Sequence, residues 1–247
     1  AGHQTGRKGG KIMAKITVLG LGPGRAGLIT RESWQIMEQA SALILRTRIH
    51  PTVAALEKAG FLFTTYDGFY EQAESFDALY TAIARDLLQR AAAGSDLVYA
   101  VPGSPLVAER TVVLLRDMAR QTEIEVDIHP GMSFVEVMYT RLGIDPIDGL
   151  TILDAEDVDT LTQCPAQSLV ITQVYNAAIA SDTKLMLMEL YPDEQEVTYI
   201  HNLALPDESI RQIPLYELDR QPDVDHLTSL FIRSQRKMNI KSTCSNK

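Results

Sequence analysis

The sequence predicts an α/β protein, because short apolar runs and amphipathic stretches alternate along most of its 247 residues. In the N-terminal half, runs rich in β-branched residues end at glycine or proline and helical patterns follow them. That order is typical of a mostly parallel sheet with helices on both faces. Hydrophobic residues make up 45% of the chain, which is enough apolar material for a core and excludes general disorder.

The N-terminal half supplies five strands and five helices in alternation. We expect strands at residues 16–21, 41–48, 61–66, 96–101 and 124–128. We expect helices at residues 28–40, 50–60, 76–93 and 108–120, and a fifth from the PGMSF segment to residue 142. Thr30 is the expected N-cap of the first helix, and Gly94 ends the third.

The C-terminal half follows a turn-rich GIDP segment and predicts a second, smaller set of elements. We expect strands at residues 150–153, 168–174, 196–202 and 213–218, the last at an edge because it contains a proline. Residues 177–190 are expected to form a helix, and residues 207–212 a short helix or turn. With 247 residues and roughly 100–200 residues per domain, two small domains fit the length.

The predicted organisation is therefore an N-terminal α/β domain at residues 13–130 and a C-terminal α/β domain at residues 131–232. Residues 1–12 are glycine-rich and basic and precede Met13, so they are expected to be a leader or tag. Residues 233–247 are basic and polar, and we expect a tail or linker there.

Composition and charge exclude several classes of function. Lys and Arg total 23 against 32 for Asp and Glu, so a net charge of −9 disfavours binding to a nucleic-acid polymer. No apolar run reaches the roughly 20 residues that span a bilayer, so no membrane segment is predicted. Cys164 and Cys244 cannot form a disulfide framework, which predicts a cytoplasmic location. His50 and His129 lack ligand-spaced partners, so no metal site is predicted.

A glycine-rich loop, GLGPGRAG at residues 20–27, lies between the first strand and the first helix. Such a loop either brings backbone close to a ligand or makes a tight turn, and the sequence alone leaves both interpretations open. Its glycines have the spacing of a dinucleotide-binding loop. That function also requires an acidic residue at the end of the second strand, where Arg46 and Arg48 stand instead, so an NAD-dependent oxidoreductase is disfavoured.

Two further Gly/Pro loops follow strands in the same half. AVPGSP at residues 100–105 makes a rigid turn where α/β proteins bind ligands, at the carboxyl end of a parallel strand. HPGMSF at residues 129–134 breaks the next strand, and its Ser133 is expected to cap a helix, a role compatible with ligand contact. We expect the three loops to converge on one rim of the sheet.

The order and spacing of these segments resemble a known family. GLGPG before LIT, VPGSP before LVAERT, and PGMSF before RLGIDP are similar to the tetrapyrrole (corrin/porphyrin) methylases, which are class III S-adenosylmethionine-dependent methyltransferases. The resemblance extends from about Lys15 to Leu230. Residues 173–200 and the IPLYELDR segment resemble the branch found as the N-terminal module of fusions with a MazG-type nucleotide pyrophosphohydrolase.

The resemblance implies that S-adenosylmethionine binds in a cleft between two α/β domains, and that an open trough of the N-terminal domain receives a large substrate. It assigns cofactor contacts to the following residues: Pro23, Gly103, Ser104, Val107, Ser133, Phe134, Gln173, Val174, Leu203 and Ala204. Leu203 suits an adenine face, but core packing explains it equally well. Many active members carry an acid where Ser104 stands, and the sequence names no catalytic residue.

The aromatic residues Tyr66, Phe69, Tyr70 and Phe76 also have two interpretations, because they suit either a flat macrocycle or a lid packed on the domain. The function predicted is an S-adenosylmethionine-dependent methyltransferase that acts, as a homodimer, on a tetrapyrrole-like or unidentified small molecule. The alternative is a cofactor-binding regulatory or scaffold module of a pyrophosphohydrolase fusion, whose second module is absent from this chain.

Overall fold

A computed structural model describes residues 14–71 and 73–234 of the chain. The chain divides into two compact units, Ala1–Met132 and Ser133–Lys247. The expected leader at residues 1–12, and the expected tail from residue 235 onward, lie outside the described residues. Each unit has its own sheet and its own core, and each is described by itself.

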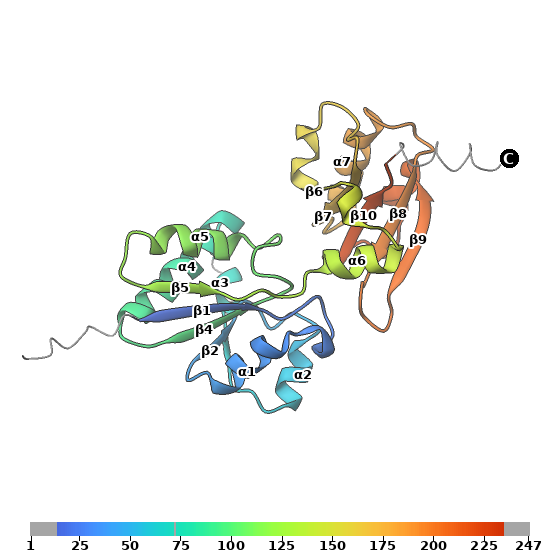
Figure 1. The fold of residues 1–247 in the computed structure, drawn as a ribbon. Helices are drawn as coiled ribbons and strands as arrows, with labels where there is room; N and C mark the ends of the chain where they lie inside the picture. Colours follow the sequence, from blue (N-terminus) through green and yellow to red (C-terminus); the bar gives the residue numbers. More distant parts are fainter. Residues whose placement is uncertain (1–13, 72, 235–247) are drawn as a thin grey trace, which may run out of the picture. The chain divides into compact units, whose positions relative to one another are not determined.

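The N-terminal unit is built on a parallel sheet, as the sequence predicts, and its five strands have the order β3-β2-β4-β1-β5. Helices α1 and α2 cover one face of the sheet, and α3, α4 and α5 cover the other (Figure 1). The strands are β1 (Lys15–Gly20), β2 (Leu43–Leu45), β3 (Thr64–Thr65), β4 (Leu97–Val101) and β5 (Glu125–Ile128). The helices are α1 (Arg31–Gln39), α2 (Val53–Lys58), α3 (Asp67–Tyr70), α4 (Phe76–Ala92) and α5 (Arg110–Ala119), with a 3₁₀ turn η1 (Ala26–Leu28) before α1.

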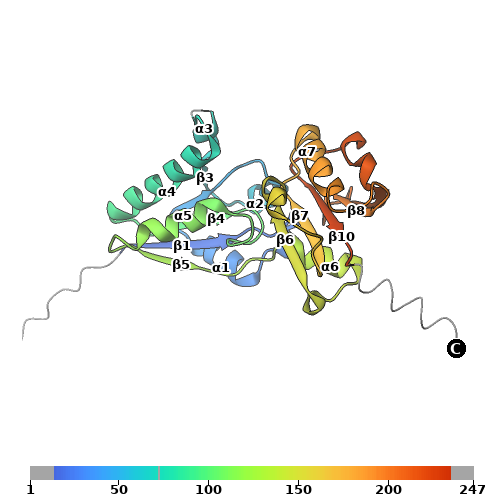
Figure 2. The ribbon, with the colours of Figure 1, turned by 90° about the horizontal axis from the view of Figure 1, so that it is seen from above.

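Burial on both faces follows from this layering. All five residues of β4 are buried, because the strand lies in the middle of the sheet with helices on each side. Figure 2 shows α4 and α5 side by side over the sheet, and their apolar faces form one core with Ile16, Tyr99 and Val101. Helix α1 begins where the sequence predicts, since Thr30 Oγ1 accepts a hydrogen bond from Ser33 N at 3.1 Å.

Two predicted strands are much shorter than expected. Residues 41–48 contribute only Leu43–Leu45, and residues 61–66 only Thr64–Thr65. The side chain of Asp67 accounts for the early end of β2, because it accepts hydrogen bonds from Thr47 Oγ1 at 2.6 Å and from Arg48 N at 2.8 Å. These bonds draw the backbone out of the ladder from Thr47 onward, after Arg46 N has donated to Ala100 O at 2.9 Å.

The C-terminal unit has a mixed five-stranded sheet of order β6-β7-β10-β8-β9. Only the β6–β7 pair is parallel, and the pairs β7–β10, β10–β8 and β8–β9 are antiparallel. The strands are β6 (Leu150–Asp154), β7 (Ser168–Thr172), β8 (Glu196–His201), β9 (Ser209–Pro214) and β10 (Thr228–Ile232). The helical elements are α6 (Phe134–Leu142), α7 (Ala177–Met188), and the 3₁₀ segments η2 (Pro146–Asp148), η3 (Ala155–Thr160) and η4 (Leu215–Arg220).

The structure corrects three expectations in this unit. Residues 207–212 do not form a helix, because most of them belong to edge strand β9, which pairs with β8. Residues 213–218 are not a separate strand, since Ile213 and Pro214 end β9 and the chain enters 3₁₀ segment η4 directly after Pro214. The central strand β10 was not predicted at all. Thr198 Oγ1 donates to Gln212 Oε1 at 3.0 Å, one of the cross-strand contacts that override the local preference of residues 207–212 for helix.

No helix within residues 14–71 and 73–234 combines the length and the apolar character needed to cross a membrane.

Candidate functional site

The loops that follow β1 and β4 are joined directly through their backbones. Leu21 N donates to Val101 O at 2.8 Å, and Gly22 and Gly103 exchange two N–H···O bonds of 3.1 and 2.9 Å. The Leu21 bond continues the parallel β1–β4 pairing, and Gly22 and Gly103 then form an isolated antiparallel bridge beyond the sheet. The first two Gly/Pro loops therefore lie together at the carboxyl edge of the parallel sheet, as the sequence predicts.

The third loop joins them through close approach of glycines. A Cβ on Gly131 would lie 2.8 Å from Gly20 Cα and 3.0 Å from Gly103 O. A Cβ on Gly20 would overlap the Gly103 carbonyl oxygen and lie 3.1 Å from Gly131 Cα. The three loops thus converge at one point, and glycine is required there by backbone packing.

The dinucleotide-loop interpretation does not match this geometry. Gly22 has a φ of +72° and packs against the Leu28 carbonyl, so it turns the loop back on itself. A Cβ on Gly27 would meet nothing, and helix α1 starts only at Arg31, after the turn η1. In a dinucleotide fold the third glycine allows tight helix–strand packing next to the phosphates. Gly27 has no such contact.

The second loop contains three of the predicted cofactor residues: Gly103, Ser104 and Val107. Val107 N donates to Ser104 O at 3.2 Å, which closes a turn that contains Pro105. Gly103 adopts a φ of +65°, and the space beside its Cα is open within 4 Å. Ala108, which follows Val107, has a φ of +54°, a left-handed conformation that is costly for alanine. Open space beside a strained loop fits a ligand held close to backbone.

Ser133 begins α6 as predicted. Its Oγ accepts a hydrogen bond from Val135 N at 3.0 Å, and its own N–H donates to Glu136 Oε2 at 2.9 Å, completing a capping box. Ser133 is buried, with 2% of its surface exposed. The helix start is therefore well ordered by its own residues, and Phe134 at the first helical position is partly buried.

In the C-terminal unit, the carboxyl ends of β7 and β8 lie at the same edge of the sheet, because both strands run antiparallel to the β10 between them. The chain takes left-handed φ values directly after both strands, at Gln173 (+63°), Asn202 (+53°) and Ala204 (+70°). With Ala108, these are the non-glycine residues of positive φ in the described part of the chain. Such strain concentrates at functional sites and needs surrounding contacts to hold it.

Those contacts are visible at the loop after β8. Ala204 N donates to Glu208 Oε2 at 2.7 Å, and Glu208 Oε1 accepts from Arg141 Nε of α6 at 2.8 Å. Asn202 Nδ2 donates to Asp207 Oδ2 at 2.6 Å. The charged side chain of Glu208 therefore links the strained loop after β8 to Arg141 of α6. The sequence interpretation had not singled out Glu208.

The predicted contacts of this unit differ in their exposure. Gln173 is half-buried, whereas Val174 is fully buried in the unit's own core. Leu203 and Ala204 are both buried. Pro23, Gly103, Ser104 and Val107 lie at the loop edge of one unit, and Gln173, Val174, Leu203 and Ala204 at the strand ends of the other. That these residues contact a cofactor stays a prediction.

A buried ion pair near the second loop was missed by the sequence interpretation. Arg46 directly follows β2, and Arg46 Nη1 lies 3.3 Å from Glu109 Oε2, next to the start of α5. Glu109 is almost completely buried. Burial raises the pKa of Glu109, although Arg46 opposes the shift. One sign of the pair is visible in the sequence, where the charged Glu109 directly follows the apolar LVA segment.

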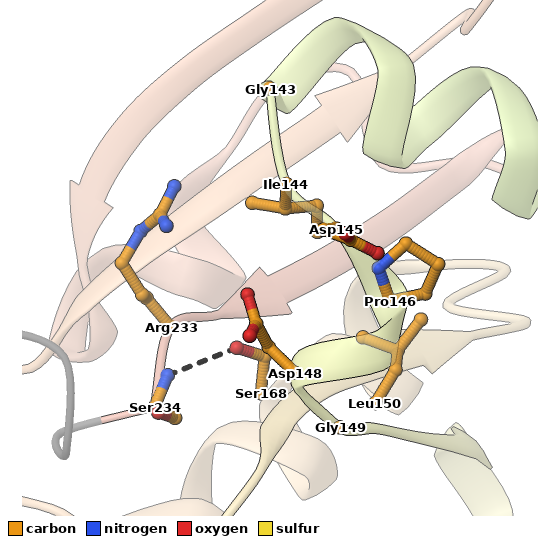
Figure 3. Close-up of a pocket in the computed structure, with 10 residues that line it drawn as sticks. All are labelled: Gly143, Ile144, Asp145, Pro146, Asp148, Gly149, Leu150, Ser168, Arg233 and Ser234. Carbon is orange, nitrogen blue, oxygen red and sulfur yellow. Dashed lines mark hydrogen bonds between the residues drawn. The ribbon is translucent and has the colours of Figure 1, made fainter.

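A separate cavity of about 200 Å³ lies at the opposite edge of the second sheet. Figure 3 shows its lining, which comes from the end of α6, the segment around η2, the starts of β6 and β7, and Arg233 and Ser234 after β10. Ser234 N donates to Ser168 Oγ at 3.1 Å across its floor. None of the predicted cofactor residues lines this cavity. Within residues 14–71 and 73–234, no cluster of three or more His, Cys, Asp or Glu side chains is arranged to hold a metal ion.

Comparison with known proteins gives a family match over most of the chain. The model of the family "Tetrapyrrole (Corrin/Porphyrin) Methylases" matches residues 15–219. A Bacillus subtilis (strain 168) relative, the uncharacterized protein YabN, is 39% identical over 221 residues, which are 90% of this chain and 45% of that protein. The chain therefore spans about half the length of this relative.

Solved structures share the fold at low sequence identity. Uroporphyrin-III-C-methyltransferase from Thermus thermophilus superposes with a TM-score of 0.70 at 19% identity, covering 92% of this chain and 98% of that one. A structure of the same type of enzyme from that organism, complexed with S-adenosyl homocysteine, gives a TM-score of 0.62 at 17% identity, with 89% and 92% covered. The precorrin-6Y methylase of Archaeoglobus fulgidus gives 0.64 at 19% identity, with 90% and 99% covered. The two-unit α/β architecture is thus that of class III methyltransferases.

Proposed function

Because the chain belongs to the tetrapyrrole methylase family, we propose that it binds S-adenosylmethionine and transfers its methyl group to a tetrapyrrole-like small molecule. The observation that carries the proposal is the loop edge of the N-terminal unit. There, three backbone loops meet through Gly20, Gly103 and Gly131 beside open space and a left-handed Ala108. Backbone strain of this kind costs free energy and occurs mainly at functional sites, so packing alone does not account for it.

The residues fit the cofactor in their chemistry. Pro23, Gly103, Ser104 and Val107 offer backbone groups and small side chains to a polar ligand, and the strained turns at Gln173 and Ala204 offer further backbone groups. The sulfonium supplies an electrophilic methyl group when bound. Positioning of the acceptor then provides most of the rate, because methyl transfer to an oriented nucleophile needs little acid–base assistance. Ser104, unlike an acid, cannot act as a base unaided, so we assign it a binding role.

Binding of S-adenosylhomocysteine tests the cofactor proposal directly. A ligand that binds only the native state stabilises it by about 2.7 kcal/mol at a hundredfold excess over its Kd. We expect a raised melting temperature and a calorimetric binding signal with S-adenosylhomocysteine, and neither with NAD. Absence of both signals at millimolar S-adenosylhomocysteine would refute the proposal.

A second candidate is a cofactor-binding regulatory module of a larger protein, of the branch associated with MazG-type pyrophosphohydrolases. Two observations favour it: Ser104 stands where many family members have an acid, and the B. subtilis relative is about twice as long. A methyl-transfer assay with radiolabelled S-adenosylmethionine and uroporphyrinogen III separates the two. Cofactor binding without transfer supports the regulatory module.

We also propose that the protein is a homodimer in the cytoplasm, as the family resemblance implies. Light scattering at micromolar concentration is expected to give twice the mass of 27.4 kDa. A mass of one chain contradicts the dimer.

A further inference from the structure

The loop between β8 and β9 is strained in a way that its own backbone does not explain. It connects His201 to Ser209, which face each other in the β8–β9 ladder. Asn202 and Ala204 adopt left-handed φ values there, of +53° and +70°. Asparagine tolerates that conformation because its short amide can hydrogen-bond locally, and Asn202 Nδ2 does so with Asp207 Oδ2 at 2.6 Å. Alanine has only a methyl group, so another side chain must hold Ala204.

The Glu208 carboxylate makes that contact. Ala204 N donates to Glu208 Oε2 at 2.7 Å, a short bond of the charge-assisted kind. Ala204 is 2% exposed, so water has little access to this N–H and does not replace the carboxylate. A trans peptide is planar, with its N–H and C=O on opposite sides, so the same bond also sets the direction of the Leu203 carbonyl. Glu208 therefore orients the backbone at two residues that the family resemblance assigns to the cofactor.

Arg141 restrains the carboxylate in turn. Arg141 Nε, in the last turn of α6, donates to Glu208 Oε1 at 2.8 Å, so both oxygens of the carboxylate are engaged. A glutamate side chain has several rotatable bonds, and the second contact restricts it to the rotamer that reaches Ala204. The side chains of Arg141 and Glu208 are 41% and 21% exposed. Solvent screens such a pair, so it adds little to stability by itself and its main effect is geometric.

The pair also connects the loop to the helix that begins at the third Gly/Pro loop. Helix α6 starts after Ser133, where a capping box with Glu136 fixes its first turn. At 1.5 Å per residue, Arg141 lies about 12 Å further along the helix, so the capping box and the ion pair fix opposite ends of α6. We propose that Glu208 is a positioning residue of the cofactor site and that Arg141 acts through it, holding the loop after β8 in the form that binds the cofactor. This inference rests on the proposed function.

A second ion pair of the same unit provides the matched control. Lys184 Nζ of α7 lies 2.6 Å from Asp219 Oδ2 of η4, and these side chains are 15% and 22% exposed. The lysine is less exposed than Arg141, so loss of this pair is expected to lower stability at least as much. Neither residue belongs to α6 or to the loop after β8. Positioning predicts that only the Arg141–Glu208 pair affects ligand binding.

Calorimetric titration of the full chain with S-adenosylhomocysteine tests the inference. Glu208→Ala is expected to raise the Kd about tenfold, the effect of losing a hydrogen bond to a charged group. Arg141→Met is expected to raise it about threefold, while the urea midpoint stays close to that of wild type. Glu208→Gln keeps an oxygen for Ala204 N–H and is expected to recover much of the affinity that Glu208→Ala loses. The double variant Arg141→Met/Glu208→Ala is expected to bind like Glu208→Ala alone, because the arginine acts through the carboxylate.

Lys184→Met separates binding from folding. Its Kd is expected to stay within about twofold of wild type, at a urea midpoint no higher than that of Arg141→Met. Where Glu208→Ala does not fold, Arg141→Met carries the test, because its exposed pair is dispensable for folding. Equal Kd values in wild type and Arg141→Met, additive losses in the double variant, or a loss with Lys184→Met as large as that with Arg141→Met overturns the inference. A wild-type protein that gives no binding signal overturns the proposed function instead.

Discussion

The two units hold strained loops at the ends of their strands by different means. In the N-terminal unit, the loops pack backbone on backbone, and Gly20 and Gly131 leave no room for a side chain. In the C-terminal unit, left-handed turns occur at alanine, asparagine and glutamine, and side chains such as Glu208 hold them. The first arrangement is fixed by steric exclusion and tolerates no replacement. The second is fixed by hydrogen bonds and can be weakened in steps.

The largest expected effect is that of a methyl group at the point where the loops meet. Gly20→Ala places Cβ against the Gly103 carbonyl, and because the atoms in contact are backbone, the loops must move apart. We expect a loss of about 3 kcal/mol or more in the free energy of unfolding, measured in urea. Gly27→Ala is the matched control, since its Cβ meets nothing. A Gly20→Ala protein as stable as the control would show that close backbone packing at Gly20 does not hold the loops together.

Removal of the side chain that holds the second loop comes next. Glu208→Ala deletes the acceptor of Ala204 N and the partner of Arg141. We expect a loss of about 1–3 kcal/mol by urea unfolding, because both bonds involve a charged group. Glu189→Ala, an exposed acid at the end of α7, is expected to stay within about 0.5 kcal/mol of wild type. A Glu208→Ala protein as stable as this control contradicts the role given to the hydrogen bonds.

Ser133 lies at the first residue of the C-terminal unit and separates capping from ligand contact. Ser133→Ala loses the cap, worth about 0.5–2 kcal/mol of stability. If the residue also contacts the cofactor, binding of S-adenosylhomocysteine by calorimetry weakens by about 0.5–1.5 kcal/mol. Ser133→Asp keeps a capping oxygen, so folding survives while the added charge disturbs the ligand. A stable Ser133→Asp protein that binds like wild type shows that the residue only starts the helix.

The smallest effect concerns ion pairs, one in each unit. The Lys184 hydrogen bond lowers the pKa of Asp219, as the Lys15 hydrogen bond lowers that of Asp127. A lowered carboxyl pKa contributes stability above the unfolded value of about 3.9, and the contribution is lost as pH falls through the folded pKa. Asp219→Asn is expected to cost about 0.5–1 kcal/mol at pH 7, and the difference from wild type to shrink below pH 4.

The two ion pairs differ in exposure, and that difference is the control. The Asp219 side chain is 22% exposed and the Asp127 side chain 38%, so solvent screens the second pair more. Asp127→Asn is therefore expected to cost less than Asp219→Asn in urea unfolding at pH 7. A cost independent of pH for Asp219→Asn would mean that its charge contributes nothing.

The sequence predicted the N-terminal unit better than the C-terminal one, for a physical reason. Its inner strands β1 and β4 are mostly buried between helices on both faces, so each is a nearly continuous apolar run, and each ends at glycine or proline. Strand β9 has one face exposed and reads Ser-Ile-Arg-Gln, a pattern with no apolar run, and its structure depends on pairing with β8. Strand β10 is apolar but follows a polar loop, and no local signal places it in the middle of a sheet.

The candidate site divides in the same way. Convergence of the three loops was predictable, because parallel strands bring their carboxyl ends to one edge. The close approach of Gly20 and Gly131 was not, since it depends on strands β1 and β5 lying next to each other. Arg46 and Glu109 were missed because they are far apart in the sequence and meet only through β2 and β4.

The place of β10 in its sheet has a consequence for synthesis of the protein. Every strand of the N-terminal sheet has been made once the ribosome passes Ile128, whereas the C-terminal sheet lacks its middle strand until Ile232. Until then β7 and β8 have no partner between them, and both expose hydrogen-bonding edges in the nascent chain. A premature stop before Thr228 therefore leaves two separate strand pairs, a form prone to aggregation, rather than a slightly shortened domain.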